Sequence, residues 1–196
     1  MKATIYIFTA ILSFTIFSCK KEKKENPQTP PPVAPTPAVG VSYQGGIIAY
    51  ILQPGDAGYD VNSPHGLIAS PSDQPEATWN NGCYITVAGT GTIYSTGNAN
   101  TGLIVSAQGI GGYAAKICSD LVLGGYSDWY LPSKIELNIL FSQATLVGGF
   151  SSVKPYWSSS QYDNTDAWVQ FFSTNGSGQS FTDKNSLLNV RAVRSF

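Results

Sequence analysis

The segment 126–137 constrains the fold of this chain more than any other stretch. Pro132 disfavours the α region for Leu131, so the backbone is extended up to that point. Ser133 and Glu136 then have the spacing of a capping box, in which the serine hydroxyl and the glutamate carboxylate each bond a free backbone N–H group. The segment therefore predicts a strand-like entry followed at once by a helix.

Hydrophobic patterning predicts the remaining elements. The predicted helix carries one apolar stripe, formed by Leu137, Leu140, Phe141 and Ala144. A second helical pattern covers 101–123, but the glycines at 109, 111 and 112 each cost about 1 kcal/mol in a helix interior, so its firm part is expected near 113–121. Apolar runs predict strands at 46–52, 66–70, 156–160, 167–172, 179–181 and 190–196. Strands, two helices and then a meander indicate an α+β fold.

The N-terminal residues indicate an export signal. Lys2 precedes an uncharged, mostly apolar run at 3–17. This run is shorter than the roughly 20 residues that a membrane span needs. It ends in Ile16-Phe17-Ser18-Cys19, which is close to a bacterial lipobox. We expect a lipoprotein signal peptide at 1–18 and lipidation of Cys19, with an ordinary secretory signal as the alternative. Lipidation would anchor the protein in the bacterial cell envelope, with the outer membrane favoured and the membrane face left open.

Residues 19–40 predict a disordered tether. A Lys/Glu cluster at 20–25 precedes a proline-dense stretch at 27–37, and neither shows the apolar periodicity that a core requires. Residues 41–196 have the length of a single domain. Acidic residues outnumber basic ones there by ten to six. Nucleic acids need a concentrated positive surface, so this composition disfavours them as partners.

Several blocks of the domain together resemble one family. They lie at 82–84, 97–101, 114–118, 125–133, 136–137, 156–160 and 190–194. The pattern is similar to the Lcl C-terminal domain family, named after the terminal domain of a bacterial collagen-like adhesin. The resemblance runs from about residue 45 to 196 and implies a C-type-lectin-like fold with two helices and twisted antiparallel sheets. For the named adhesin it implies attachment to sulfated glycans, while most relatives have no assigned activity, so the fold transfers more safely than the function.

A weaker resemblance is to formylglycine-generating enzymes, whose related fold also has a Leu-Pro helix entry. Those enzymes need reactive cysteines late in the chain, and here none follows Cys118. The single histidine, His65, lies in a predicted turn, which disfavours a zinc site. No Gly-x-Ser-x-Gly motif surrounds the serines at 158–160, so a serine triad is also disfavoured. We therefore expect no catalysis and no cofactor.

Cys83 and Cys118 lie in a chain that we expect to be exported, and exported thiols tend to oxidise. A disulfide between them is predicted to stabilise the fold by roughly 3–4 kcal/mol. The alternative is two separate buried thiols.

Charged and aromatic residues within the family blocks are expected to be structural. We predict that Arg191 or Arg194 contacts Asp128 or Glu136, which would hold the last strand to the helix entry. Trp129, Trp157 and Trp168 are expected in the core. The alternative is a sugar-stacking face that contains Tyr156, Trp157 and Trp168.

Three oxygen-bearing side chains cluster in one predicted loop, at Asp163, Asn164 and Asp166. Calcium takes six to eight oxygen ligands and this spacing fits no established loop, so a turn is favoured over a metal site. The function expected from the sequence is recognition of a glycan or other surface ligand through the loops at 71–100 and 161–166. The alternatives are a structural or protein-binding module of an envelope assembly and an enzyme of the formylglycine-generating type.

Overall fold

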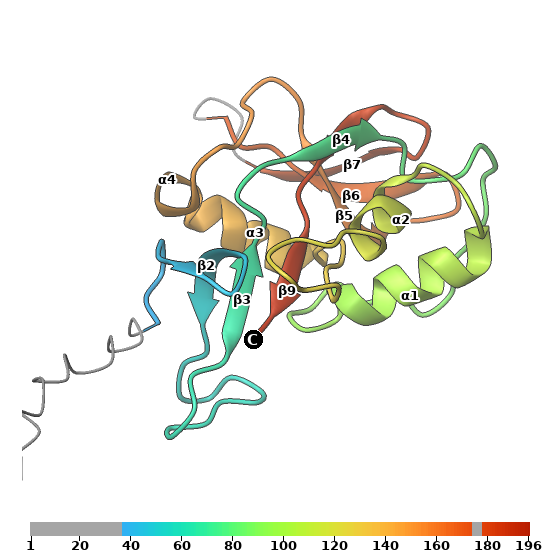
Figure 1. Ribbon diagram of the computed structural model, residues 1–196. Coiled ribbons are helices and arrows are strands. Elements are labelled where there is room, and N and C mark those ends of the chain that lie inside the picture. The colour runs from blue at the N-terminus through green and yellow to red at the C-terminus, as the bar shows by residue number, and fades with distance from the viewer. Residues whose placement is uncertain (1–36, 174–177) are drawn as a thin grey trace, which may run out of the picture. The chain divides into compact units, whose positions relative to one another are not determined.

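The computed structural model describes residues 37–173 and 178–196 (Figure 1). The predicted signal peptide at 1–18, the predicted lipidation site Cys19 and the tether up to residue 36 lie outside them. No helix of the described part is long and apolar enough to cross a membrane. The segment Thr36–Phe196 is one compact unit. Its buried apolar side chains form two hydrophobic clusters, a main cluster that contains Trp157 and a second cluster that contains Tyr156. A fragment that starts at residue 36 therefore contains both hydrophobic clusters of the described residues.

Two sheets organise this unit (Figure 1). The antiparallel four-stranded sheet has the order β1 (Ser42–Tyr43), β2 (Gly46–Ile51), β3 (Gly66–Ala69), β9 (Val193–Ser195). The five-stranded sheet has the order β4 (Gln74–Ala77), β8 (Leu188–Val190), β5 (Tyr156–Gln161), β6 (Asp166–Gln170), β7 (Gln179–Asp183). It is antiparallel except between β5 and β8. Since only Arg191 and Ala192 separate β8 from β9, the end of the chain links the two sheets.

The described residues form four helices: α1 (Gly97–Gln108), α2 (Ala114–Ser119), α3 (Lys134–Ser142) and α4 (Ala144–Val147). The α+β class is confirmed, but the expectation of two helices is too low. The break at the glycines lies where the sequence predicts it, with Gly109 at a φ of 72° after the last residue of α1. The longer helix is α1, however, and it starts earlier than predicted. Its buried face consists largely of small or polar residues, which hydrophobic periodicity does not detect: Gly97, Asn100, Thr101 and Ile104.

The start of α3 has the local geometry that its sequence dictates. The Ser133 hydroxyl accepts a hydrogen bond from the Glu136 backbone N–H, and the Glu136 carboxylate accepts one from the Ser133 N–H at 2.8 Å. Leu137 and Leu140 are buried on the inner side of the helix. The capping box therefore fixes the direction in which α3 leaves the extended segment.

The core accounts for two of the three tryptophans expected there. Trp129 and Trp157 are buried in the main hydrophobic cluster. Trp168 belongs to neither cluster and is partly exposed, so its assignment to the core is wrong. Side chains alternate between the two faces of a strand. Because Ala167 and Val169 of β6 face the core, Trp168 must point to the opposite face.

Candidate functional site

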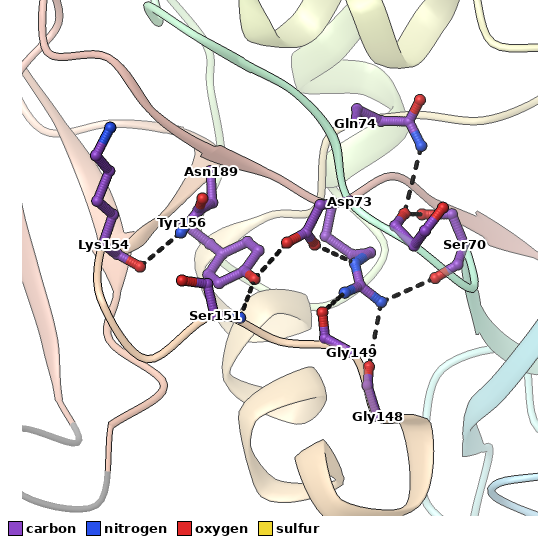
Figure 2. A network of polar contacts seen from close by, with 11 residues as sticks. Ser70, Asp73, Gln74, Gly148, Gly149, Ser151, Lys154, Tyr156 and Asn189 are labelled. Carbon is purple, nitrogen blue, oxygen red and sulfur yellow. Dashed lines mark hydrogen bonds and ion pairs between the residues drawn. The ribbon is translucent and has the colours of Figure 1, made fainter.

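Arg191 is a buried cation at the junction of the two sheets. Its side chain is inaccessible to solvent, and Nε donates to the Asp73 carboxylate at 2.6 Å. The guanidinium also donates to the backbone carbonyls of Ser70, Gly148 and Gly149. The second Asp73 oxygen accepts a hydrogen bond from the Tyr156 hydroxyl at 2.7 Å, as Figure 2 shows. Arg191 thus ties the β3–β4 connection and the loop after α4 to the end of the chain.

Arg194 makes one of the ion pairs expected from the sequence. Its Nε and terminal nitrogen donate to the two Asp128 oxygens at 2.7 and 2.9 Å, and its guanidinium lies 3.9 Å from the Tyr126 ring centroid. The Arg194 hydrogen bonds lower the pKa of Asp128. Arg191 pairs with Asp73, which the sequence did not single out. Glu136 accepts from the backbone N–H groups of Ser95 and Ser133, and burial raises its pKa.

The loop at 163–166 is a hydrogen-bonded turn. The Asp163 carboxylate accepts from the backbone N–H groups of Thr165 and Asp166, both at 2.8 Å, and these bonds lower its pKa. The Asn164 side-chain oxygen accepts from the Thr86 hydroxyl at 3.1 Å. Over the described ranges, no group of three or more His, Cys, Asp or Glu side chains could hold a metal ion. Asp163 and Asp166 thus accept hydrogen bonds within the turn, and Asn164 connects the turn to Thr86.

A lysine ammonium lies beneath this turn. Lys184 is buried, and its Nζ donates to the carbonyls of Asp163 and Asn164 at 2.8 Å. It also donates to the Gln161 side chain at 2.8 Å and the Ile85 carbonyl at 3.2 Å. Burial lowers the pKa of Lys184 to about 8, while nearby carboxylates oppose this shift. The sequence pattern contained no signal for this role, because the lysine follows a strand in a polar turn and resembles a surface residue.

An aromatic cluster lies beside the turn, on the face of the five-stranded sheet opposite the main hydrophobic cluster. We call Tyr162, Trp168 and Phe181 the aromatic face. The Tyr162 and Phe181 rings are stacked, with centroids 3.8 Å apart and an interplanar angle of 1°. Trp168 stands nearly perpendicular to both. Tyr162 is 47% exposed and Phe181 45% exposed. Trp168 and Phe181 lie on strands and Tyr162 directly follows β5, so the rings are held in place yet left partly exposed, which are properties of a binding surface.

Polar groups surround the aromatic face. Trp168 and Phe181 are directly opposite on β6 and β7, and so are Asp166 and Asp183. Two-residue spacing places all four on the same face of the sheet. The Tyr84 hydroxyl donates to Asp183, and the Lys134 ammonium lies 3.2 Å from the Trp168 ring centroid. The surface therefore combines aromatic rings with carboxylates and one partly exposed cation.

A separate hollow of about 480 Å³ lies beside α3 and α4 and is lined in part by Phe141, Phe150 and Phe172. Phe150 and Phe172 are stacked at 4.2 Å, and both pack against Tyr156 in the second hydrophobic cluster. Phe150 and Phe172 therefore pack at the edge of the second hydrophobic cluster. The aromatic face is consequently the better candidate for ligand recognition.

The disulfide expected between Cys83 and Cys118 is not formed, and both thiols are free. Cys118 is fully buried on the inner side of α2, in the main hydrophobic cluster, whereas Cys83 is exposed in the loop that follows Trp79. Burial raises the pKa of the Cys118 thiol. The expectation was wrong because α2 turns its cysteine toward the core and away from the surface loop.

His65 and the serines at 158–160, which were considered as catalytic residues, make hydrogen bonds within the fold. His65 is exposed, and its Nδ1 lies 3.1 Å from the Phe196 carbonyl oxygen. The three serines at 158–160 are buried. Ser158 donates to the Trp168 carbonyl and Ser160 to the Gly91 carbonyl, while Ser159 accepts from the Asn100 amide. They bond neighbouring segments together.

No protein-family model and no curated protein sequence matches the chain. The fold is similar to the crystal structure of a fimbrial protein from Bacteroides ovatus ATCC 8483, with a TM-score of 0.50 and 17% sequence identity. The match covers 76% of this chain and 43% of that chain, so this chain spans less than half of the neighbour's length. At this identity the similarity describes the fold alone.

Proposed function

We propose that this protein is a non-catalytic recognition protein of the bacterial cell envelope, and that it binds a glycan or a similar surface polymer on the aromatic face. The half-exposed, stacked pair of Tyr162 and Phe181 carries this proposal. Sugar rings have an apolar face and a rim of hydroxyl groups. A flat aromatic surface flanked by Asp166 and Asp183 suits both parts of such a ligand.

Two similarities support the cellular setting of this proposal. The structural neighbour is described as a fimbrial protein, which is consistent with a cell-surface or envelope role. The sequence blocks resemble the Lcl C-terminal domain, which implies a C-type-lectin-like fold and an adhesive role. Lipidation at Cys19 would hold the domain at the membrane. We propose that recognition needs no calcium, because the Lys184 ammonium already bonds the turn carbonyls of Asp163 and Asn164.

A glycan array probed with residues 36–196 tests the proposal. We expect binding to a defined set of glycans and a loss of at least tenfold in affinity for Phe181→Ser and Tyr162→Ser. The matched control is Ile110→Ser, which removes an apolar side chain that is 94% exposed between α1 and α2. Unchanged binding by both aromatic variants would place recognition elsewhere.

The second candidate is a protein-binding module of an envelope assembly, which the fimbrial neighbour favours. A blank glycan array together with specific capture of an envelope protein, lost in Phe181→Ser but retained in Ile110→Ser, would support this alternative over glycan binding.

A further inference from the structure

The edges of the two sheets differ in how well they are protected. An exposed edge strand presents unpaired N–H and C=O groups, which proteins protect with short strands, prolines, charges or bulges. Among the described residues, β1 has two residues, and β9 has three and forms a bridge from Val193 to Tyr130. The edge strand β4 contains Pro75 and Glu76 and has a register shift. Three of the four edges are therefore protected.

The fourth edge, β7, is the least protected, because its one charged residue, Asp183, is the last residue of the strand. It has five residues, no proline and no lysine, and it pairs with β6 in continuous register. On its other side, no strand from the described ranges pairs with it. Its residues Ser180, Phe181 and Asp183 are exposed, so this side is open to solvent.

Two hydrogen bonds that flank β7 define which of its backbone groups point outward. The Phe171 N–H donates to the Gly178 carbonyl at 3.1 Å, and the Lys184 N–H donates to the Thr165 carbonyl at 2.9 Å. Residues bonded to a neighbouring strand alternate with residues that are not. Even-numbered residues of β7 therefore bond β6, and the N–H and C=O groups of Gln179, Phe181 and Asp183 point away from it. The Asp183 carbonyl already accepts from the Ser186 N–H at 2.9 Å, so within the described ranges the open edge consists of the outward groups of Gln179 and Phe181 and the Asp183 N–H. The Ser180 hydroxyl approaches the Phe181 carbonyl only at 3.5 Å.

We propose that β7 pairs with β7 of a second copy of this chain, antiparallel and centred on Phe181, so that the two five-stranded sheets become continuous. In this register Phe181 faces the partner's Phe181, and Gln179 faces the partner's Asp183. All outward residues then have partners, whereas a slipped register leaves outward groups unpaired. The one charged side chain of the strand meets a neutral amide, so no like charges are opposed.

The pairing has a consequence for ligand binding. Phe181 lies on the same side of the sheet as Trp168. The aromatic faces of the two copies would therefore lie side by side on one surface. A polymeric ligand could then occupy both, which raises its apparent affinity without new contacts. The pairing itself does not depend on the proposed function, because it rests on the backbone edge alone.

Charge substitutions at one position test both the partner and the register. Sedimentation equilibrium of residues 36–196 is expected to show a concentration-dependent dimer. Gln179→Lys would face the partner's Asp183 and tighten the dimer about fivefold, while Gln179→Glu would weaken it about fivefold. Both variants replace the Gln179 amide that donates to the Lys134 carbonyl, so the stability of each variant is measured beside its dimerisation. A wild type that stays monomeric at millimolar concentration, or equal shifts in both variants, would overturn the proposal.

Cysteine cross-linking tests the centre of the pairing in a Cys83→Ser background. Directly opposite residues in a hydrogen-bonded antiparallel pair have Cα atoms about 5.5 Å apart, which suits a disulfide. Phe181→Cys is therefore expected to form a covalent dimer on oxidation. Gln179→Cys is expected to stay monomeric because its counterpart lies several residues away along the strand. Cross-linking at 179 but not at 181 would refute this register. Glycan binding by a strictly monomeric protein would refute the pairing and leave the proposed function intact.

Discussion

The Arg191 junction and the aromatic face use the same chemical groups for opposite purposes. In both, a cation lies over an aromatic ring: Arg191 is 4.2 Å from the Phe150 centroid, and Lys134 is 3.2 Å from the Trp168 centroid. Arg191 is fully buried and hydrogen-bonded to a carboxylate and three carbonyls. A buried charge requires such a set of partners, whereas a surface charge is solvated. Burial therefore makes the first region part of the fold and leaves the second available for a ligand.

The largest effect on stability is expected at the junction. Arg191→Met would leave Asp73 without its cationic partner and the carbonyls of Ser70, Gly148 and Gly149 without the guanidinium donor, so the free energy of unfolding should fall by about 3–5 kcal/mol. Urea unfolding of residues 36–196 measures this loss. Arg191→Lys should recover little of it, because an ammonium cannot reproduce the planar fork of donors. A loss below about 1 kcal/mol would show that the junction is dispensable.

The second largest effect is expected at Lys184, beneath the turn at 163–166. Lys184→Met would leave the carbonyls of Asp163 and Asn164 without their donor and lower the free energy of unfolding by about 2–3 kcal/mol. Since Lys184 holds the turn beside the aromatic face, glycan affinity should fall as well. A variant as stable as the wild type would contradict this role.

The pH dependence of Lys184 gives a separate test. Its folded pKa of about 8 lies below the ordinary value of about 10.4, so the unfolded chain binds more protons between these pH values. The free energy of unfolding of the wild type, relative to Lys184→Met, should therefore rise as pH increases from about 8 to 10. Urea titrations at several pH values measure the difference, and a flat difference would show that the ammonium loses no proton in this range.

A smaller effect is expected at Arg194, because its partner Asp128 is 54% exposed. Arg194→Met should lower the free energy of unfolding by about 1 kcal/mol. Since Arg194 lowers the pKa of Asp128, this stabilisation is present above the ordinary aspartate pKa and is lost as pH falls through the folded value. Acid titration of Asp128→Asn should consequently show a shallower loss of stability than the wild type. If the wild type and Asp128→Asn lose stability equally as pH falls, the ion pair is screened by solvent.

The smallest effect on stability is expected on the aromatic face. Phe181→Ser removes a half-exposed ring from an edge strand, so the cost should be about 1 kcal/mol or less. Phe181→Ser should also lose glycan binding, whereas Arg194→Met should bind glycans as the wild type does. Thermal unfolding and affinity measurements on both variants would separate fold residues from ligand residues. A large destabilisation by Phe181→Ser would assign the aromatic face to the fold.

Local signals predicted a large part of the fold. The helix start at Ser133, the break at Gly109 and most strands depend on backbone preferences or on alternation over a few residues. The extent of α1 could not be predicted in this way, because its buried face includes Gly97, Asn100 and Thr101. Such residues are recognised as interior only when the elements that cover them are known. The candidate turn at 163–166 was found from its oxygen-bearing side chains, but the rings beside it were not grouped with it.

The sequence by itself determined the α+β class, the capped helix and the presence of charged and aromatic residues in the family blocks. Only the tertiary structure decided how those residues are used. Arg191 meets Asp73 because the β8–β9 link lies against the β3–β4 connection, and Cys118 faces the core while Cys83 lies outside it. Trp168 points outward because the pairing of β6 assigns its neighbours to the core. Local sequence specifies backbone conformation over a few residues, whereas burial and partner choice depend on segments far apart in the chain.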